Sequence, residues 1–455
     1  MTMVGVLHQM PAQAGRSAEW RGEASPQAFS DETPAPCQGQ RDAGRDLLRQ
    51  ALAKENMESA WKRVKANKGV AGVDGMDIAQ TKRHLVNAWP NIRDQLMAGT
   101  YRPSPVRRVG IPKPDGSERE LGIPTVTDRL IQQALLQVLQ PLIDPTFSEH
   151  SHGFRPGRRA RDAILAAQQY VQDGAHVVVD VDLSKFFDRV NHDILINRLA
   201  RRVNDSGVIR LVRAYLSAGI MYNGVLVNRE EGTPQGGPLS PLLANVLLDE
   251  VDRELEKRGH HFVRYADDCN VYVRSSRAGA RVMALLKRLY TKLHLQINES
   301  KSAVASAFGR KFLGYELWLK GGTKVMRAVS RKALGTFQHK IRQITRRSGG
   351  KSIAMVIVKL RQYVLGWKEY FKLTQTPQVW RRLDEWMRRR MRSTYLKQWR
   401  RPTTIYRAVI ALGASPKQAR IAASFSGRWW HGSRVGLNSV LTISYFDRLG
   451  MPRLT

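Results

Sequence analysis

The sequence lacks the features of a secreted, zinc-binding or membrane protein. Only Cys37 and Cys269 are cysteines among 455 residues, so neither a disulfide framework nor a zinc cluster is expected. No apolar run reaches the roughly 18 residues that a membrane helix requires. The first residues also lack the apolar core of a secretory signal. We therefore expect a protein of a reducing, cytoplasmic compartment with no membrane partner.

Acidic residues are also scarce. The chain has 39 Asp and Glu against 74 Lys and Arg, a net charge of +35, which predicts a polyanionic partner. From Met326 onward, 28 basic and 4 acidic residues stand beside six of the ten Trp. Basic and aromatic side chains together suit phosphates and unstacked bases. Packing in a helical core is nevertheless the more common role for most of these Trp.

Hydrophobic periodicity divides the chain into three kinds of segment. Residues 1–45 are rich in Ala, Pro, Gly and Gln without periodicity, which predicts a disordered leader. One amphipathic helix is predicted over 47–64, and the centre mixes strands and helices in an α+β pattern. After about residue 326 the strands stop, and helices are predicted near 331–346, 353–372, 377–397 and 403–412.

Two predicted strand ends carry acidic residues. Asp267 and Asp268 lie in a Tyr-Ala-Asp-Asp turn between two apolar runs, and Asp182 closes a separate buried run. Three carboxylates brought together suit Mg²⁺, and a pair of such ions can clamp both oxygens of a phosphoryl displacement. Ordinary turn chemistry also explains an Asp-Asp hairpin tip. Asp180 shares a strand face with Asp182 and is the rival metal ligand.

Cationic and glycine-rich loops lie around these acids along the chain. Lys113 and Arg119 border a Pro-Asp-Gly turn and can hold a triphosphate, although a solvated basic hairpin is the simpler interpretation. Arg155 lies in a basic glycine loop that can grip a nucleic-acid backbone. Gln235 lies in a Gly/Pro loop that lets a backbone approach a base pair closely. Lys301 can reach a leaving pyrophosphate, although a surface lysine is the commoner explanation.

Two aromatic residues follow Asp182. Phe187, five residues later, can floor a sugar pocket and exclude a 2′-hydroxyl, the group that distinguishes RNA from DNA. Core packing is the alternative for both rings, and for Phe186 it is our prediction.

The order of these segments resembles the reverse transcriptases encoded by bacterial group II introns, from about Lys68 to Tyr315. The most specific motifs are Gly-Thr-Pro-Gln-Gly-Gly before Ser-Pro-Leu-Leu, and Arg-Tyr-Ala-Asp-Asp. The glycine loop 69–75 is similar to the template-contacting N-terminal extension of that family. Leu365-Gly366-Trp367-Lys368-Glu369-Tyr370-Phe371 is similar to its maturase region.

The resemblance implies an α+β right-hand polymerase with fingers, a palm with an antiparallel sheet and a thumb, followed by an all-α basic maturase and DNA-binding region. The expected boundaries are 46–175 for the N-terminal extension and fingers, and 176–325 for the palm. Residues 326–400 are the expected thumb and maturase domain, and 401–455 the basic region that binds DNA or RNA.

The resemblance also implies site residues. The metal ligands for two Mg²⁺, or Mn²⁺ as a substitute, are Asp182, Asp267, Asp268 and the backbone carbonyl of Leu183. The dNTP is expected beside Lys113, Arg119, Phe187, Gln235, Gly236 and Lys301. Template or primer contacts are expected from Gly72, Gly75, Arg155 and Tyr265, and RNA contacts from Trp367, Lys368, Arg388, Arg389 and Arg390.

The implied activity is RNA-directed DNA polymerisation, coupled to binding of the parent intron RNA for splicing and to copying of that RNA at a target-DNA primer. This activity belongs in the bacterial cytoplasm, near the nucleoid. Glu120 departs from the family, which often has proline there, and Cys269 stands where an aromatic is common. The absence of an endonuclease motif after the maturase region is similar to the short members.

Two alternatives remain for the function. One is an RNA-binding splicing factor with a relic polymerase fold, which the intact carboxylates at 182, 267 and 268 oppose. The other is a reverse transcriptase independent of any intron, serving defence or repair.

Overall fold

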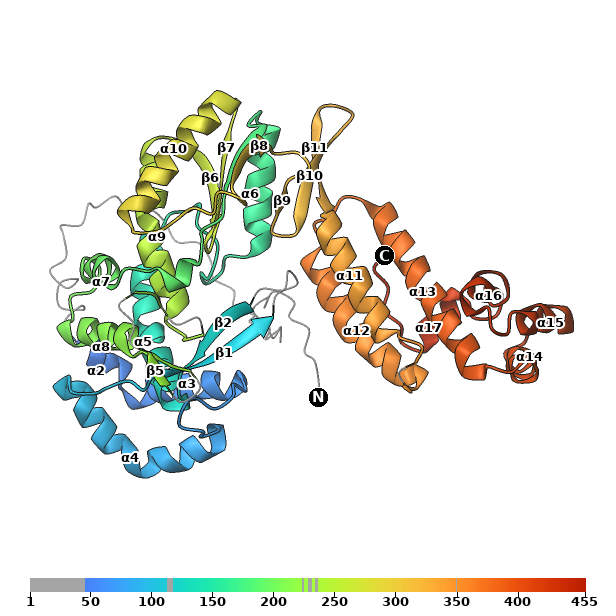
Figure 1. The fold of residues 1–455 in the computed structure, drawn as a ribbon, viewed down its shortest axis with the longest axis horizontal. Helices are drawn as coiled ribbons and strands as arrows, with labels where there is room; N and C mark the ends of the chain where they lie inside the picture. The colour runs from blue at the N-terminus through green and yellow to red at the C-terminus, as the bar shows by residue number, and fades with distance from the viewer. Residues whose placement is uncertain (1–45, 113–117, 223–224, 228–230, 234–235, 349) are drawn as a thin grey trace, which may run out of the picture. The chain divides into compact units, whose positions relative to one another are not determined.

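The computed structural model describes residues 46–112, 118–222, 225–227, 231–233, 236–348 and 350–455 (Figure 1). The predicted leader, Lys113 and Gln235 lie outside these ranges. The fold is mixed α+β, as predicted. It divides into two compact units, one of Met1–Arg158, Asp180–Val271 and Ala280–Ala303, the other of Arg159–Val179, Tyr272–Gly279 and Val304–Thr455. Within the described ranges, no helix is long and apolar enough to cross a membrane.

Three helices open the described chain: α2 (Leu47–Ala51), α3 (Lys54–Ala66) and α4 (Ile78–Ala98). The prediction of one continuous helix over 47–64 is wrong, because Ala53 adopts an extended backbone (ψ 144°) that separates α2 from α3. Helix α4 was not predicted. It begins at a capping box formed by Asp77 and Gln80 and ends at Gly99, whose φ of 74° is the left-handed value that glycine accepts readily.

The first sheet has the order β2-β1-β4-β5. Strands β1 (Val106–Pro112) and β2 (Glu118–Ile123) are antiparallel, with Gly110 opposite Glu120. β4 (Ile220–Tyr222) pairs parallel to β1 and antiparallel to β5 (Val225–Val227). Glu120 forms an ion pair with Arg108 of the neighbouring strand, so this departure from the family pattern has a partner within the hairpin.

The first unit contains several helices that begin at side-chain N-caps and one helix, α9, that is mostly buried. Thr125 caps α5 (Val126–Ile143), which runs into the short η1 (Asp144–Thr146). Asn191 caps α7 (His192–Ala200), and Asp205 caps α8 (Ser206–Ser217). Helix α9 (Ser240–Lys257) buries 12 of its 18 residues, including Asn245, Asp249 and Asp252. Polar side chains at such positions require hydrogen-bond partners, and those partners shape the site.

The central sheet has the order β6-β7-β3-β8. Its strands are β6 (His261–Tyr265), β7 (Asp268–Val273), β3 (Val177–Val181) and β8 (Ala303–Ser306), and η2 (Phe186–Asp188) follows β3. Helix α6 (Ala160–Gln172) contacts β7 through Tyr170 and Tyr272, whose ring centroids are 5.9 Å apart. Helix α10 (Ser276–Lys292) contacts β8 at Gly279, where a Cβ would lie 2.4 Å from Val304 Cγ1. The sheet thus brings both predicted acidic strand ends into one layer.

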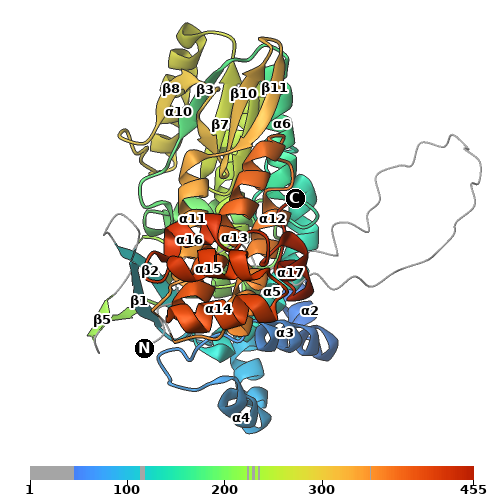
Figure 2. The same ribbon diagram turned by 90° about the vertical axis from the view of Figure 1, so that its right-hand side faces the viewer.

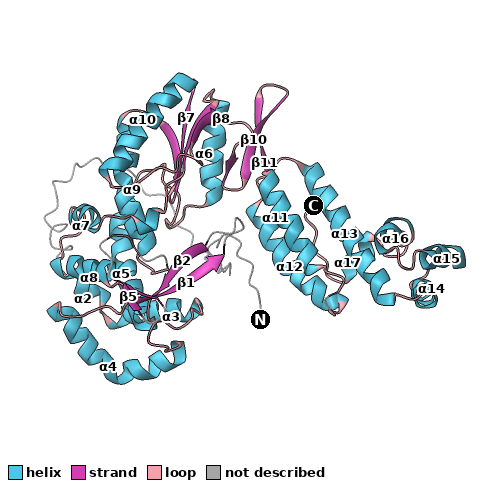
Figure 3. Cartoon of the chain, in the orientation of Figure 1, coloured by secondary structure: helices cyan, strands magenta, loops and turns pink. Residues whose placement is uncertain are grey.

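From Arg331 the described chain is helical, in a segment that we call the helical region (331–455; Figures 2 and 3). A small sheet precedes it, with the order β11-β10-β9, formed by β9 (Lys311–Phe312), β10 (Tyr315–Lys320) and β11 (Lys324–Val329). The four predicted helices are confirmed as α11 (Arg331–Ile344), α12 (Ile353–Tyr370), α13 (Pro377–Trp399) and α14 (Pro402–Ala411). Three further helices were not predicted: α15 (Pro416–Ser424), α16 (Trp429–Val435) and α17 (Ile443–Arg448).

Candidate active site

Asp182 follows the last residue of β3 and is held by the segment 298–302. Its backbone N–H donates to Ser302 Oγ at 3.0 Å, and its carbonyl accepts from Asn298 N at 2.8 Å. Lys301 Nζ lies 3.4 Å from Asp182 Oδ2, and 29% of the Asp182 side chain is exposed. The carboxylate is therefore fixed by its backbone, open to solvent and already facing a cation.

The second acidic segment is the carboxylate turn, which we define as Tyr265–Asp268. It joins β6 to β7, as predicted, with Ala266 and Asp267 at the tip. Asp267 is half-buried, whereas Asp268 is exposed at the start of β7. Tyr265 is also half-buried, and burial raises the pKa of its hydroxyl.

A side-chain contact joins the end of β3 to the start of β7. With the Asn270 amide nitrogen oriented toward β3, it donates to Asp180 Oδ1 at 2.9 Å. Asp180 precedes Asp182 by two residues, and Asn270 follows Asp268 by two. The contact explains Asp180, the rival ligand, as the partner of an amide, and it joins the two strands that lead to Asp182 and the carboxylate turn.

The donor chemistry of these residues fits a hard divalent cation, since carboxylate oxygens are the preferred ligands. The positively charged Lys301 ammonium already lies beside the Asp182 carboxylate, where a metal ion would bind. Within the described ranges, however, no group of three or more His, Cys, Asp or Glu lies together at a spacing that could hold a metal. The roles of Asp182, Asp267 and Asp268 as metal ligands stay a prediction. Leu183, whose carbonyl is the fourth predicted ligand, is buried and bridges to Ile297.

Phe187, the predicted sugar-binding aromatic, contacts the loop that holds Gly232, Thr233 and Gly236, which we call the glycine-rich loop. The Phe187 carbonyl accepts from Thr233 N at 2.7 Å, and a Cβ on Gly232 would lie 2.9 Å from that same carbonyl. Phe186 is 3% exposed, which confirms its predicted core role. Phe187 is half-buried and packs edge-on against Phe186 with ring centroids 5.0 Å apart. The Phe187 ring is therefore only partly covered, while its backbone carbonyl is bonded to the loop.

The same loop approaches β2. A Cβ on Gly236 would lie 2.6 Å from the Gly122 carbonyl, and its φ of 135° is one that only glycine adopts readily. Arg119 lies in β2 opposite Ile111. The loop thus joins two predicted nucleotide-binding segments that are far apart in the sequence.

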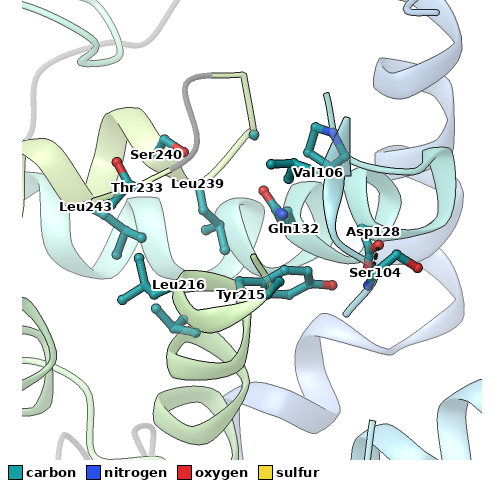
Figure 4. A pocket seen from close by; sticks show the side chains of 14 residues that line it. Ser104, Val106, Asp128, Gln132, Tyr215, Leu216, Thr233, Leu239, Ser240 and Leu243 are labelled. Carbon is teal, nitrogen blue, oxygen red and sulfur yellow. Dashed lines mark hydrogen bonds between the residues drawn. The ribbon is translucent and has the colours of Figure 1, made fainter. Parts of the chain in front are cut away.

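A small cavity lies beneath this loop, lined from α5, α8 and α9 by Gln132, Tyr215 and Leu243 among others (Figure 4). Its volume of ≈ 20 Å³ is enough for about one water molecule. Asp128 at its edge accepts from Tyr101 Oη at 2.8 Å and from Thr125 Oγ1 at 2.7 Å, and burial raises the pKa of this carboxyl. The cavity is too small for a nucleotide and belongs to the support of the loop.

The predicted template contacts have mixed outcomes. Arg155 is wrongly assigned to nucleic acid, because its five N–H groups face five oxygens: Asp144 Oδ1, Oδ2 and O, Ser148 O and Ser151 O. Gly72 packs against Thr125, where a Cβ would meet the backbone at 2.6 Å, whereas the space around Gly75 is open. Gly72 and Gly75 stay predictions.

The predicted RNA contacts also need correction. Trp367 is 6% exposed and packs against Phe337, Phe371 and Trp380, with centroids 4.2–5.1 Å away, so it is a core residue. Lys368 Nζ donates to the carbonyls of Arg453 and Thr455. Arg389 lies 4.0 Å from the centre of the Trp430 ring, and Arg388 is half-buried. These arginines stay candidates for RNA binding.

Sequence reasoning missed the neighbours of Arg390, which are Trp386 and two further arginines. Arg342 and Arg390 lie 5.6 and 5.5 Å from the centre of the Trp386 ring. Burial lowers the pKa of Arg390, and the charges of Arg347 and Arg342 lower it further. We call Arg342, Arg347 and Arg390 the arginine cluster. Arg342 and Arg347 lie 48 and 43 residues before Arg390, so the chain gives no local sequence signal for this group.

Comparisons with known proteins agree with this arrangement. Residues 111–317 match the family described as reverse transcriptase (RNA-dependent DNA polymerase), and residues 334–410 match the group II intron, maturase-specific domain. Protein YkfC of Escherichia coli (strain K12) is 36% identical over 218 residues, covering 47% of this chain and 57% of that protein. Group II intron-encoded protein LtrA of Lactococcus lactis subsp. cremoris is 29% identical over 304 residues, covering 52% and 51%.

The chain spans about half the length of these curated relatives. A solved structure titled "Partial Cas6-RT-Cas1--Cas2 complex" matches 56% of this chain and 43% of its own at 25% identity and a TM-score of 0.36. That structural likeness is too small to indicate function. By these matches the chain combines a reverse transcriptase domain with a group II intron, maturase-specific domain, and the proteins it is similar to include group II intron-encoded ones.

Proposed function

We propose that this protein is an RNA-directed DNA polymerase encoded by a group II intron, which also binds its intron RNA to promote splicing. Target-primed copying of that RNA into DNA is the reaction it serves. The observation that carries the proposal is the fixing of Asp182 and the carboxylate turn at adjoining strands of one sheet. The maturase-specific match at 334–410 supports the link to an intron.

The divalent metal of this activity is Mg²⁺, with Mn²⁺ as a substitute. Asp182, Asp267, Asp268 and the Leu183 carbonyl are the residues that would hold two ions. When bound, Mg²⁺ favours ionisation of the primer 3′-hydroxyl and neutralises charge on the departing pyrophosphate. The chain's own contribution is to hold the acids rigidly, through Ser302 and Asn298 for Asp182.

The incoming dNTP is proposed to lie between the glycine-rich loop and Asp182. The half-buried Phe187 is bonded to that loop through its carbonyl, and Lys301, 3.4 Å from Asp182, is proposed to contact phosphate. Lys113, Arg119, Gln235 and Gly236 complete the proposed nucleotide site. Gly72, Gly75 and Tyr265 are proposed to contact template or primer.

The macromolecular partners are proposed to be the intron RNA, an RNA template with a DNA primer, and target DNA. The net charge of +35, with most of its excess in the helical region, supports binding of a polyanion. We place this activity in the bacterial cytoplasm, at the nucleoid when DNA is the partner.

The proposal is tested by primer extension on an RNA template with Asp267→Ala. Loss of a metal-binding carboxylate should lower the rate of nucleotide addition by about a thousandfold or more, while template–primer affinity changes little. Asp193→Ala is the control, because its side chain is 79% exposed and pairs with Arg213 on the surface. Equal DNA synthesis by the wild-type protein and Asp267→Ala would refute the assignment.

Phe187→Ala tests the proposed sugar contact. Loss of the ring should reduce the preference for dNTP over rNTP by about tenfold or more, because nothing then crowds a 2′-hydroxyl. The measurement is the ratio of incorporation efficiencies for matched dNTP and rNTP, in which any general loss of activity cancels. An unchanged ratio would assign Phe187 to packing alone.

A further inference from the structure

Arg264, immediately before the carboxylate turn, is a fully buried charge. Its side chain is 0% exposed, as is that of Asp252 in α9. Arg264 Nε donates to Asp252 Oδ1 and Oδ2 at 2.8 and 2.9 Å, and Nη2 donates to Oδ2 at 2.5 Å. A buried charge is tolerated when it is paired in this way. The pair anchors the guanidinium plane to α9.

The remaining nitrogen of Arg264 reaches the tip of the turn. Nη1 donates to Asn245 Oδ1 at 2.8 Å and to the Ala266 carbonyl at 3.0 Å. Ala266 has a φ of 58°, a left-handed conformation that costs a non-glycine residue free energy and needs support from its surroundings. The bond from Arg264 supplies that support at the residue before Asp267.

Peptide geometry carries this contact to the catalytic acid. The Ala266 carbonyl and the Asp267 nitrogen and Cα belong to one planar peptide unit. Fixing the direction of the Ala266 carbonyl therefore fixes the Asp267 Cα, from which its carboxylate projects. An arginine suits this task because its rigid fork serves Asp252, Asn245 and Ala266 at once, whereas a lysine ammonium presents its donors at a single point.

The other side of the turn is closed by the loop 150–153. Asn245 Nδ2 donates to the Gly153 carbonyl at 2.9 Å, and a Cβ on Gly153 would lie 2.1 Å from Ala266 N. The backbones of Arg264 and this loop exchange bonds, with Arg264 N to His150 O at 2.9 Å and His152 N to Arg264 O at 2.8 Å. The turn is thus enclosed by the guanidinium on one side and backbone on the other.

We propose that Arg264 is a positioning residue that sets the orientation of Asp267 through the Ala266 carbonyl, with Asn245 and Asp252 holding its guanidinium in place. The inference rests on the proposed polymerase activity, since it concerns the acid on which that activity depends. It assigns a function to three buried polar residues that do not themselves touch substrate.

The same helix offers a matched control. Asp249 lies three residues before Asp252 and its side chain is 2% exposed. It accepts from Arg202 Nη2 at 2.5 Å and from Ser148 N at 3.2 Å. Arg253 Nε also lies 3.5 Å from Asp249 Oδ2. Asp249 is therefore a second buried carboxylate of α9 paired with arginine, and its hydrogen bonds come from Arg202 and Ser148 instead of from Arg264.

The test compares Arg264→Lys and Asn245→Ala with Asp249→Asn. We expect the first two to slow single-turnover dNTP addition at saturating dNTP by about ten- to a hundredfold, the effect of a small displacement of a reacting group. Template–primer affinity should stay within about threefold of wild type, so the loss appears in kcat and not in the binding of template–primer. Mn²⁺ affinity, measured by electron paramagnetic resonance, should fall in parallel. Asp249→Asn should lower the melting temperature while leaving dNTP addition and Mn²⁺ affinity near wild type.

Equal loss of addition in Asp249→Asn and in the other two variants would overturn the inference, as would normal addition and Mn²⁺ affinity in folded Arg264→Lys. Should Arg264→Lys fail to fold, Asn245→Ala decides, because it leaves the Arg264–Asp252 pair intact. Failure of the proposed function gives a different result: the wild-type protein would then not extend a primer, or Asp267→Ala would extend it normally.

Discussion

Arginine has two different environments in this molecule. In the first unit, the Arg155 and Arg264 side chains are 3% and 0% exposed, and each is matched by a carboxylate, Asp144 or Asp252. In the helical region, Arg342 and Arg390 of the arginine cluster lie against Trp386, and no carboxylate pairs with the cluster in the part of the chain that the structure describes. A buried guanidinium whose charge is neutralised by a carboxylate donates to nearby backbone carbonyls and holds them in place. A guanidinium without such a carboxylate can bind an anion from outside the protein.

The acids of the helical region explain this difference. There are four against 28 basic residues from Met326 onward, and three of the four are already engaged. Asp384 accepts from the N–H groups of Leu454 and Thr455, while Glu369 and Asp447 pair with Lys372 and Arg453. Too few carboxylates remain to neutralise the arginines, so the region carries a net positive field.

Replacement of one arginine from each environment gives the largest contrast. Arg155→Ala should lower the free energy of unfolding by about 3–5 kcal/mol, because it leaves buried acceptors and Asp144 without a partner. Arg390→Ala should cost about 1 kcal/mol or less, since it removes a half-exposed charge from among like charges. Denaturant unfolding followed by circular dichroism measures both. Similar losses in the two variants would remove the distinction between the environments.

The tryptophans of the helical region divide in the same way. Trp367 is 6% exposed within the core, whereas Trp430 is 38% exposed beneath Arg389. Trp367→Ala should cost about 3 kcal/mol of stability through the cavity it leaves. Trp430→Ala should cost about 1 kcal/mol, the worth of a surface cation–π contact. If RNA affinity of the folded Trp367→Ala protein fell more than that of Trp430→Ala, the core assignment of Trp367 would be wrong.

Motif order identified the segments from which the proposed site is built, and burial decided the roles that it missed. The segments containing Asp182, Phe187, Gly236 and the carboxylate turn follow one another in the chain, and the structure joins them through bonds such as Thr233 N to Phe187 O. Arg155 and Trp367 were misassigned because a basic loop and a basic helix look exposed in sequence. Their acceptors and ring partners come from other segments, which periodicity does not identify.

A signal for Arg264 was nevertheless present. It is the charged residue of an apolar strand, Phe262-Val263-Arg264-Tyr265, and a strand position of that kind is buried with a partner or lies at an edge. The buried Asp252 one helix earlier is its complement. The helix break at Ala53 had no comparable signal, because alanine itself favours helix.

The arginine cluster gives the last and smallest contrast, with control residues on α13, the helix that carries Arg390. Replacing both Arg342 and Arg390 with Gln should weaken binding of a structured RNA on the order of tenfold at moderate salt, because two converging charges are lost. The slope of log affinity against log salt should fall by about one for each lost contact. Arg381→Gln with Arg382→Gln is the control: both residues are exposed on α13, outside the cluster, and their loss changes net charge equally. Filter-binding titrations at several salt concentrations separate the cases. Equal losses of RNA affinity in the two double variants would mean that RNA responds to the total charge of the helical region. A larger loss of affinity for the Arg342 and Arg390 variant would mean that the arginine cluster is a binding surface in its own right.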